Sequence, residues 1–201
     1  MTELLHIDWL DGVAYVINPA GRIIAYGRPH WNRFAAENEA ADLCEAESII
    51  GLDLLGIVRG KDVCAAYRHL IKELLQGRRD GFAFAFRCDA PHMRREMRMA
   101  ITPVRRRGEV TSILFQSILL NQEMRPPLDI FRFGDQAAAL GCDPGQKVVT
   151  LCSWCQKVRA DDWGSDPRWI SAEEYYRCGG EVDVLINHGI CEGCTASLQR
   201  G

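Results

Sequence analysis

The chain has 201 residues, a formal net charge of −3 at pH 7 and 47% hydrophobic residues, which is the composition of a soluble globular protein. Its length accommodates one ordinary domain and one small domain. The negative charge argues against broad electrostatic capture of nucleic acid, and the longest apolar run, residues 110–120, is interrupted by polar residues and too short to cross a bilayer.

The first predicted elements are a hairpin and a helix. Two short β-rich runs, residues 13–17 and 22–26, flank a turn with proline and glycine at residues 18–21, which predicts an antiparallel hairpin. Residues 31–38 follow as a helix, because apolar residues recur at helical spacing. The shared apolar face consists of Trp31, Phe34 and Ala35.

A longer helix and three strands complete the N-terminal part. The helix covers about residues 61–76 and ends at Gly77. Residues 82–86 alternate phenylalanine with alanine, which is typical of a half-buried strand. In residues 97–102 the apolar Met97, Met99 and Ile101 alternate with Arg98, Ala100 and Thr102, which predicts a second strand. Residues 110–120 form a third strand, so the predicted order is β-β-α-α-β-β-β.

This order of elements resembles the PAS domain, and the likeness covers residues 8–120. Residues 14–24 resemble the opening hairpin of that family, residues 31–34 resemble its next helix, and residues 51–55 resemble the turn into its long helix. The resemblance implies an α+β fold, in which a five-stranded antiparallel sheet carries helices on one face. It also implies a sensor that responds to a ligand or forms a homodimer.

The resemblance leaves the ligand of the PAS-like domain open. A photoreceptor flavin requires a reactive cysteine in a Gly-x-Asn-Cys-Arg-like stretch, which the sequence lacks. Haem requires an axial ligand, and His69 on the long helix is the candidate at a suggestive place. A helix-surface histidine beside Arg68 is more often solvated, so we assign no PAS ligand.

Residues 121–147 form a predicted linker. Prolines and glycines interrupt it and leave only a short predicted helix around residues 135–140. Such a segment either tethers two units or docks on the PAS-like core through Leu128, Ile130 and Phe131.

The strongest chemical signal lies in residues 148–201, which hold two Cys-x-x-Cys pairs. Four thiolates in this spacing are typical of a structural zinc site, because each pair grips one edge of a tetrahedron. The predicted ligands are Cys152, Cys155, Cys191 and Cys194. His188 also has ligand spacing to the second pair. We expect it to bond a sulfur from outside the site, because four cysteines already saturate the metal.

The segment between the cysteine pairs is itself predicted to fold. Residues 169–170 read as a strand, residues 171–174 as a capping box that starts a helix, and residues 182–186 as a second strand. A closing helix over residues 192–200 carries Cys194 in its first turn. A metal-binding turn, a hairpin-like insert and a ligand-bearing helix together make the treble-clef plan.

The same segment resembles a small cysteine-rich module that follows PAS or receiver domains in bacterial signalling proteins. The likeness rests on residues 151–155, 161–163, 169–175 and 188–191. It implies a zinc-binding module in a bacterial signal-transduction protein.

The expected cellular compartment is consistent with free thiols at the remaining cysteines. The N-terminus lacks the basic start and apolar middle of a signal peptide, so we expect a cytoplasmic protein whose thiols stay reduced. The other cysteines are predicted to be small buried side chains rather than reactive thiols. They are Cys44, Cys64, Cys88, Cys142 and Cys178.

Residues 78–107 hold nine arginines against three acidic residues. One interpretation is an anion site or a partner surface that uses the bidentate geometry of guanidinium. The other is a solvated sheet face on which an Arg87–Asp89 salt bridge fixes the loop between two strands. We favour the second, because surface charge runs seldom act specifically.

No catalytic motif is present in the sequence, so we expect a signalling protein rather than an enzyme. Its zinc module is expected to present a surface to a protein partner, without a membrane or nucleic acid. Two alternatives stay open. One is a DNA-binding regulator that uses Lys157 and Arg159, although the acidic residues of the module oppose this. The other is a zinc–thiolate redox switch.

Overall fold

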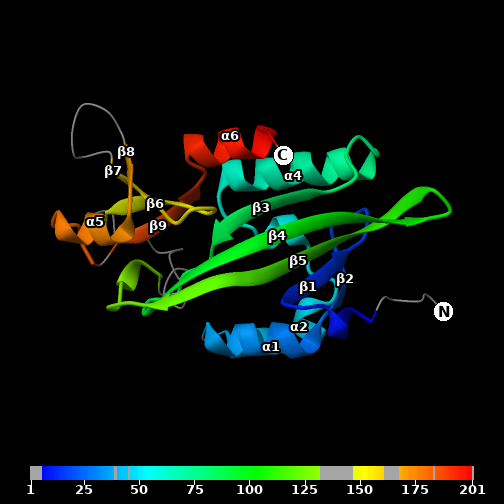
Figure 1. The fold of residues 1–201 in the computed structure, drawn as a ribbon, viewed down its shortest axis with the longest axis horizontal. Coiled ribbons are helices and arrows are strands. Elements are labelled where there is room, and N and C mark those ends of the chain that lie inside the picture. The colour runs from blue at the N-terminus through cyan, green and yellow to red at the C-terminus, as the bar shows by residue number, and fades with distance from the viewer. Residues whose placement is uncertain are drawn as a thin grey trace.

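The structure, a computed structural model, describes six stretches of the chain: residues 6–38, 40–44, 46–131, 147–160, 168–182 and 184–200. It contains two sheets, a larger one from the N-terminal part and a smaller one from the C-terminal part (Figure 1). The predicted helix around residues 135–140, the resemblance over residues 161–163 and Cys142 lie outside the described residues.

The larger sheet has five strands in the order β2-β1-β5-β4-β3, and every neighbouring pair is antiparallel. This confirms the predicted α+β, PAS-like fold. The strands are β1 (Val13–Ile17), β2 (Ile23–Tyr26), β3 (Phe82–Arg87), β4 (Met93–Arg106) and β5 (Glu109–Met124).

The last two strands are longer than predicted. Their ladder continues from the core outward until Met93 pairs with Met124, so β4 begins four residues before Met97. Residues 121–124 of the predicted linker are therefore strand.

Four helices accompany this sheet: α1 (Arg28–Glu37), α2 (Ala46–Ile49), α3 (Leu54–Ile57) and α4 (Lys61–Leu75). The helix α1 starts three residues before the predicted Trp31, because Pro29 is tolerated in a first helical turn. Short 3₁₀ turns are η1 (Ile7–Trp9), η2 (Ala41–Cys44) and η3 (Asp129–Phe131).

The core of the PAS-like domain lies on one face of the larger sheet, under α4. Ile101 and Phe115 face each other across β4 and β5, and both are fully buried. Above them α4 buries residues that recur at helical spacing, as its amphipathic pattern predicts. These are Val63, Leu70, Ile71 and Leu74.

The smaller sheet has the order β8-β7-β6-β9, in which β6 and β9 are parallel and the other pairs antiparallel. Two helices belong to this unit, α5 (Ala172–Arg177) and α6 (Glu192–Arg200). The strands are β6 (Val148–Cys152), β7 (Val158–Ala160), β8 (Arg168–Ile170) and β9 (Leu185–Gly189).

Local predictions for this second unit were mostly correct. The Ser171 hydroxyl accepts a hydrogen bond from the Glu174 amide at 3.0 Å and caps α5. The strand predicted from Val182 begins instead at Leu185, because pairing with β6 starts only there. Val182 is exposed.

The two units share packed side chains. Figure 1 shows α6 beside α4, and Leu198 of α6 packs against a cluster that includes Val63 and Trp154. Ile130 and Phe131 of η3 pack in the core of the second unit, and not on the PAS-like core as one interpretation had it. The Ile130 amide donates to the Tyr176 hydroxyl at 3.0 Å, which holds η3 there.

Candidate metal centre

The four predicted ligands come together at one point. The sulfur atoms of Cys152, Cys155, Cys191 and Cys194 all lie within 4.8 Å of one another, with Cys155 and Cys191 3.6 Å apart. Four Zn–S bonds of ~2.3 Å in a tetrahedron place the sulfurs ~3.8 Å apart. The cluster therefore has the size and the donor set that a tetrahedral metal ion needs.

Two backbone turns hold the sulfurs in place. In the first, between β6 and β7, the Cys152 amide donates to the Lys157 carbonyl at 2.8 Å, and Gln156 takes a positive φ of 59° to close the turn. The second is the start of α6, where the Thr195 amide donates to the Cys191 carbonyl at 2.9 Å. The Cys191 amide points at the sulfur of Cys152, 3.4 Å away.

Three of the thiols, those of Cys152, Cys155 and Cys194, have pKa values shifted by hydrogen bonds to one another. Hydrogen bonds from the thiols of Cys155 and Cys194, supported by backbone amides, lower the pKa of Cys152 far below its usual range. The same bonds raise the pKa of Cys155, to about 12, and that of Cys194. A cation bound by these sulfurs would replace thiol protons, because a metal binds the thiolate form.

His188 does not make the bond that was expected of it. Among the described residues, its Nδ1 atom lies 3.4 Å from the Ser153 hydroxyl, and no hydrogen bond to a cysteine sulfur is found. Burial and the nearby charge of Arg59 lower the pKa of His188, so the ring is held neutral beside the turn.

The first turn also docks on the PAS-like domain. Trp154, which lies between two of the ligands, is buried and stacks on Tyr67 of α4, with ring centroids 5.8 Å apart. Phe84 of β3 packs against it at 5.4 Å, and the Arg87 amide donates to the Trp154 carbonyl at 2.6 Å. The turn that carries Cys152 and Cys155 is thus built onto α4 and β3.

An ionic cluster joins the two units beside this contact. The fully buried carboxylate of Asp89 pairs with Arg87, which confirms the predicted salt bridge. Arg125 also reaches Asp89, and its Nη1 atom lies 3.0 Å from both Asp89 and Glu173 of α5. Sequence reasoning missed Arg125, because it lies beyond the arginine-rich segment and its partners are distant in sequence.

Other predicted residues lie elsewhere. His69 is exposed on α4, away from any haem-binding position in the core. Cys178 is exposed, so its prediction as a buried side chain was wrong; it caps α5 at a turn that faces solvent. Cys44, Cys64 and Cys88 are partly buried, as expected of small apolar side chains.

No protein-family model and no curated protein matches the sequence. Among solved structures, the chain is similar to the PAS domain of BvgS from Bordetella pertussis, with 13% identity and a TM-score of 0.43 over 57% of this chain and 81% of that one. A sensory box sensor histidine kinase from Vibrio cholerae has 12% identity and a TM-score of 0.37 over 57% and 86%. The phage VqmA–DPO complex has 14% sequence identity and a TM-score of 0.41, and the match covers 57% of this chain and 50% of that one.

The first of these structures is described as a PAS domain and the second as a sensor histidine kinase, but likeness at this level says nothing about the ligand, activity or partner of this chain. In the described part of the chain, no helix is both long enough and apolar enough to cross a membrane.

Proposed function

We propose that the four cysteines hold one structural zinc ion. The observation that carries this is the cluster itself, in which four sulfurs lie within 4.8 Å of one another on two Cys-x-x-Cys turns. Soft thiolates in a tetrahedron favour zinc over the harder cations, and four protein ligands leave no open position for catalysis. A bound zinc ion would supply four Zn–S bonds that fix both turns.

The role that we propose for the whole chain is that of a bacterial signalling protein without a catalytic output of its own. Trp154 supports this, because it ties the metal-binding turn to α4 and β3 of the PAS-like domain. A shift of α4 on ligand binding or dimerisation would be transmitted to the second unit. That unit would then present an altered surface to a protein partner.

Metal content tests the zinc site. Purified protein should contain one zinc ion per chain, and Cys194→Ser should lose it, because one ligand of four is removed. Cys178→Ser is the matched control, since Cys178 is exposed and outside the cluster. Wild-type protein that carries no metal, or equal loss in both variants, would contradict the site.

Partner capture tests the signalling role. Full-length wild-type protein and Cys194→Ser, each immobilised, should retain different sets of proteins from an extract. Identical sets would count against a partner surface that depends on the metal.

A further inference from the structure

The two outer strands of the larger sheet, β2 and β3, differ in how their free edges are covered (Figure 1). At the β2 edge, the Ile23 amide donates to the Leu52 carbonyl at 2.9 Å, and the Gly51 amide donates to the Ile23 carbonyl at 2.8 Å. This loop closes β2 as a further strand would. Among the described residues, the β3 edge makes a single backbone hydrogen bond of this kind, at Arg87.

The backbone groups of Ala83 and Ala85 point outward from β3. Residues of an antiparallel strand direct their amide and carbonyl groups alternately to one neighbour and to the other. The Arg87 amide points away from β4, because it donates to the Trp154 carbonyl at 2.6 Å. Ala83 and Ala85 have the same outward direction and are exposed, and no described residue bonds their outward groups. Two amides and two carbonyls are therefore open to a further strand.

The β3 edge also lacks the features that keep edge strands from pairing. Natural edge strands carry charges, prolines or bulges that prevent the approach of another strand. Residues 82–86 consist of alternating phenylalanine and alanine, and their pairing with β4 has no register shift. The small alanine side chains leave the backbone accessible, so this edge favours strand addition.

One segment of the chain already begins such a pairing. Trp154 accepts the bond from the Arg87 amide, and its ring packs against Phe84 with centroids 5.4 Å apart. The pairing ends there, because the chain turns back and the Gln156 amide donates to the Cys152 carbonyl at 2.9 Å. A separate extended segment would continue the pairing along the rest of β3.

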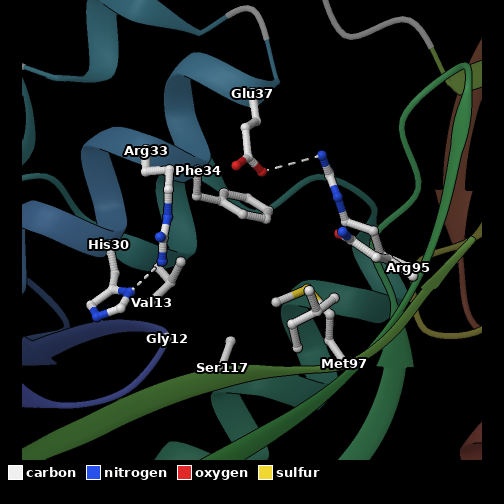
Figure 2. Close-up of a pocket in the computed structure, with 11 residues that line it drawn as sticks. Gly12, Val13, His30, Arg33, Phe34, Glu37, Arg95, Met97 and Ser117 are labelled. Atoms are coloured by element: carbon white, nitrogen blue, oxygen red, sulfur yellow. Dashed lines mark hydrogen bonds and ion pairs between the residues drawn. The ribbon is translucent and has the colours of Figure 1, made fainter.

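The arginines of β4 indicate the charge of that segment. Successive side chains of a strand point to opposite faces, so Arg95 and Arg98 lie on different faces of the sheet. Arg95 lines a pocket of about 300 Å³ beside α1 (Figure 2). Arg98 pairs with Ala85 across the strands, is exposed, and forms no ion pair with a described residue. The nearby Glu96 pairs instead with Arg94 at 3.1 Å, so positive charge is left beside the open edge.

We propose that the edge of β3 binds an extended segment of a partner protein as an added antiparallel strand, in which acidic and apolar residues alternate. Acidic side chains opposite Ala83 and Ala85 lie on the face of Arg98, and the apolar side chains lie on the face of the β3 phenylalanines. This goes beyond the signalling role above, because it places a partner on the PAS-like domain. It uses none of the cysteines, so its failure would leave the zinc site untouched.

Fluorescence anisotropy of labelled peptides with the full chain tests the proposal. A peptide of three Glu-Val repeats should bind saturably with one site per chain. The same peptide with N-methylated glutamates should not bind, because it has no amide hydrogens for the carbonyls of Ala83 and Ala85. Three Lys-Val repeats should bind at least about tenfold more weakly, because lysine opposes Arg98 with like charge.

Variants of the chain locate the binding site. Ala85→Pro should weaken binding of the Glu-Val peptide at least about tenfold, because proline has no amide hydrogen. It should fold, since that amide lies outside the β3–β4 ladder, and Ala85→Val is the matched control that keeps the hydrogen. Arg98→Gln should reduce the preference for the Glu-Val over the Lys-Val peptide. Arg68→Gln, an equal charge change on the exposed face of α4, should preserve it.

Several results would overturn the proposal. They are absence of saturable Glu-Val binding to the wild-type chain, equal binding of the N-methylated or the Lys-Val peptide, and unchanged affinity in folded Ala85→Pro. A wild-type dimer that Ala85→Pro converts to a monomer in analytical ultracentrifugation would also do so, because the edge would then bind a second copy. If Ala85→Pro fails to fold by circular dichroism, the N-methylated peptide decides the same question on the wild-type chain.

Discussion

A single side chain, Trp154, belongs to two cores at once. It stands in the turn between Cys152 and Cys155, yet its ring packs on Tyr67 and Phe84 of the PAS-like domain and is only 4% exposed. Burial of one tryptophan contributes several kcal/mol, roughly 3–5 by the cost of its removal to alanine. Whatever loosens the metal-binding turn therefore withdraws a large apolar side chain from the PAS-like core.

The partner of Trp154 gives a pH prediction. Burial raises the pKa of Tyr67 from 10.0 to about 12. The unfolded chain therefore releases this proton at a lower pH than the folded chain. The contribution of the neutral Tyr67 side chain to the free energy of unfolding is fully present below pH 10. It falls by about 3 kcal/mol as the pH rises to about 12.

Urea unfolding followed by circular dichroism between pH 9 and 12 measures this loss. Tyr67→Phe should remove most of it, and Tyr15, whose pKa burial also raises, should retain a part. An unchanged slope in Tyr67→Phe would sink the prediction.

At the residue scale, the sequence showed which residues form local sites better than it showed which distant residues they contact. The cysteines and the Arg87–Asp89 pair could be predicted because their spacing is local. The role of Trp154 could not, because nothing in the spacing of a loop residue indicates which domain it packs against. The sequence likewise did not distinguish Arg95 from its solvated neighbours. In the structure, its position on β4 places its guanidinium against the ring of Phe34.

Among the elements, α4 and β9 meet at an unusually close point. Gly60, which precedes α4, has a φ of +89°, and a Cβ atom there would lie 2.3 Å from the backbone oxygen of His188 in β9. Only glycine combines this conformation with this contact. The start of α4 therefore rests directly on the second unit.

Two glycine variants separate the contact from the backbone strain. Gly60→Ala and Gly51→Ala both place a side chain at a φ near +90°, which costs about 1–2 kcal/mol, but Gly51 has open space around its Cβ position. Gly60→Ala should lose a further 1–3 kcal/mol or so by overpacking, measured by urea unfolding. It should also shift the tryptophan emission of the protein to the red, because Trp154 becomes more exposed. Equal losses in the two variants would show that the contact with β9 is unimportant.

The elements themselves were predictable where their pattern is local. The amphipathic repeat of α4, the cap of α5 and the alternation in β3 each predicted the observed element. The parallel pairing of β6 with β9 was not predicted, because it joins strands that are separated by most of the module. Local patterns carry no register for such a pairing.

For the whole molecule, the shared core would couple the proposed zinc ion to the stability of both units. Arg125 bridges Asp89 and Glu173 across the units, and Phe131 lies under its guanidinium at 4.4 Å. Because the proposed zinc ion would bind only the folded site, its removal would subtract the linked free energy from folding. The PAS-like domain should therefore lose stability together with the module.

Chelation tests this coupling. Treatment with a strong zinc chelator should lower the Tm of the far-ultraviolet circular dichroism transition and expose Trp154, and added zinc should restore both. Acid should have the same effect, because protons compete with the metal for the thiolates as the pH falls. A chelated protein that melts at the wild-type temperature would show that the two units are independent.

The parallel strand pair in the smaller sheet has a consequence for how the protein is made. Synthesis runs from the N-terminus, so the larger sheet, which ends at Met124, leaves the ribosome before β6, and β9 emerges only just before Cys191. Until Trp154 follows β6 out of the ribosome, the side of α4 that this tryptophan covers is exposed on the nascent polypeptide. In a cell short of zinc, loss of the proposed ion would leave that apolar side exposed and invite chaperones and proteases, so zinc supply would set how much protein survives.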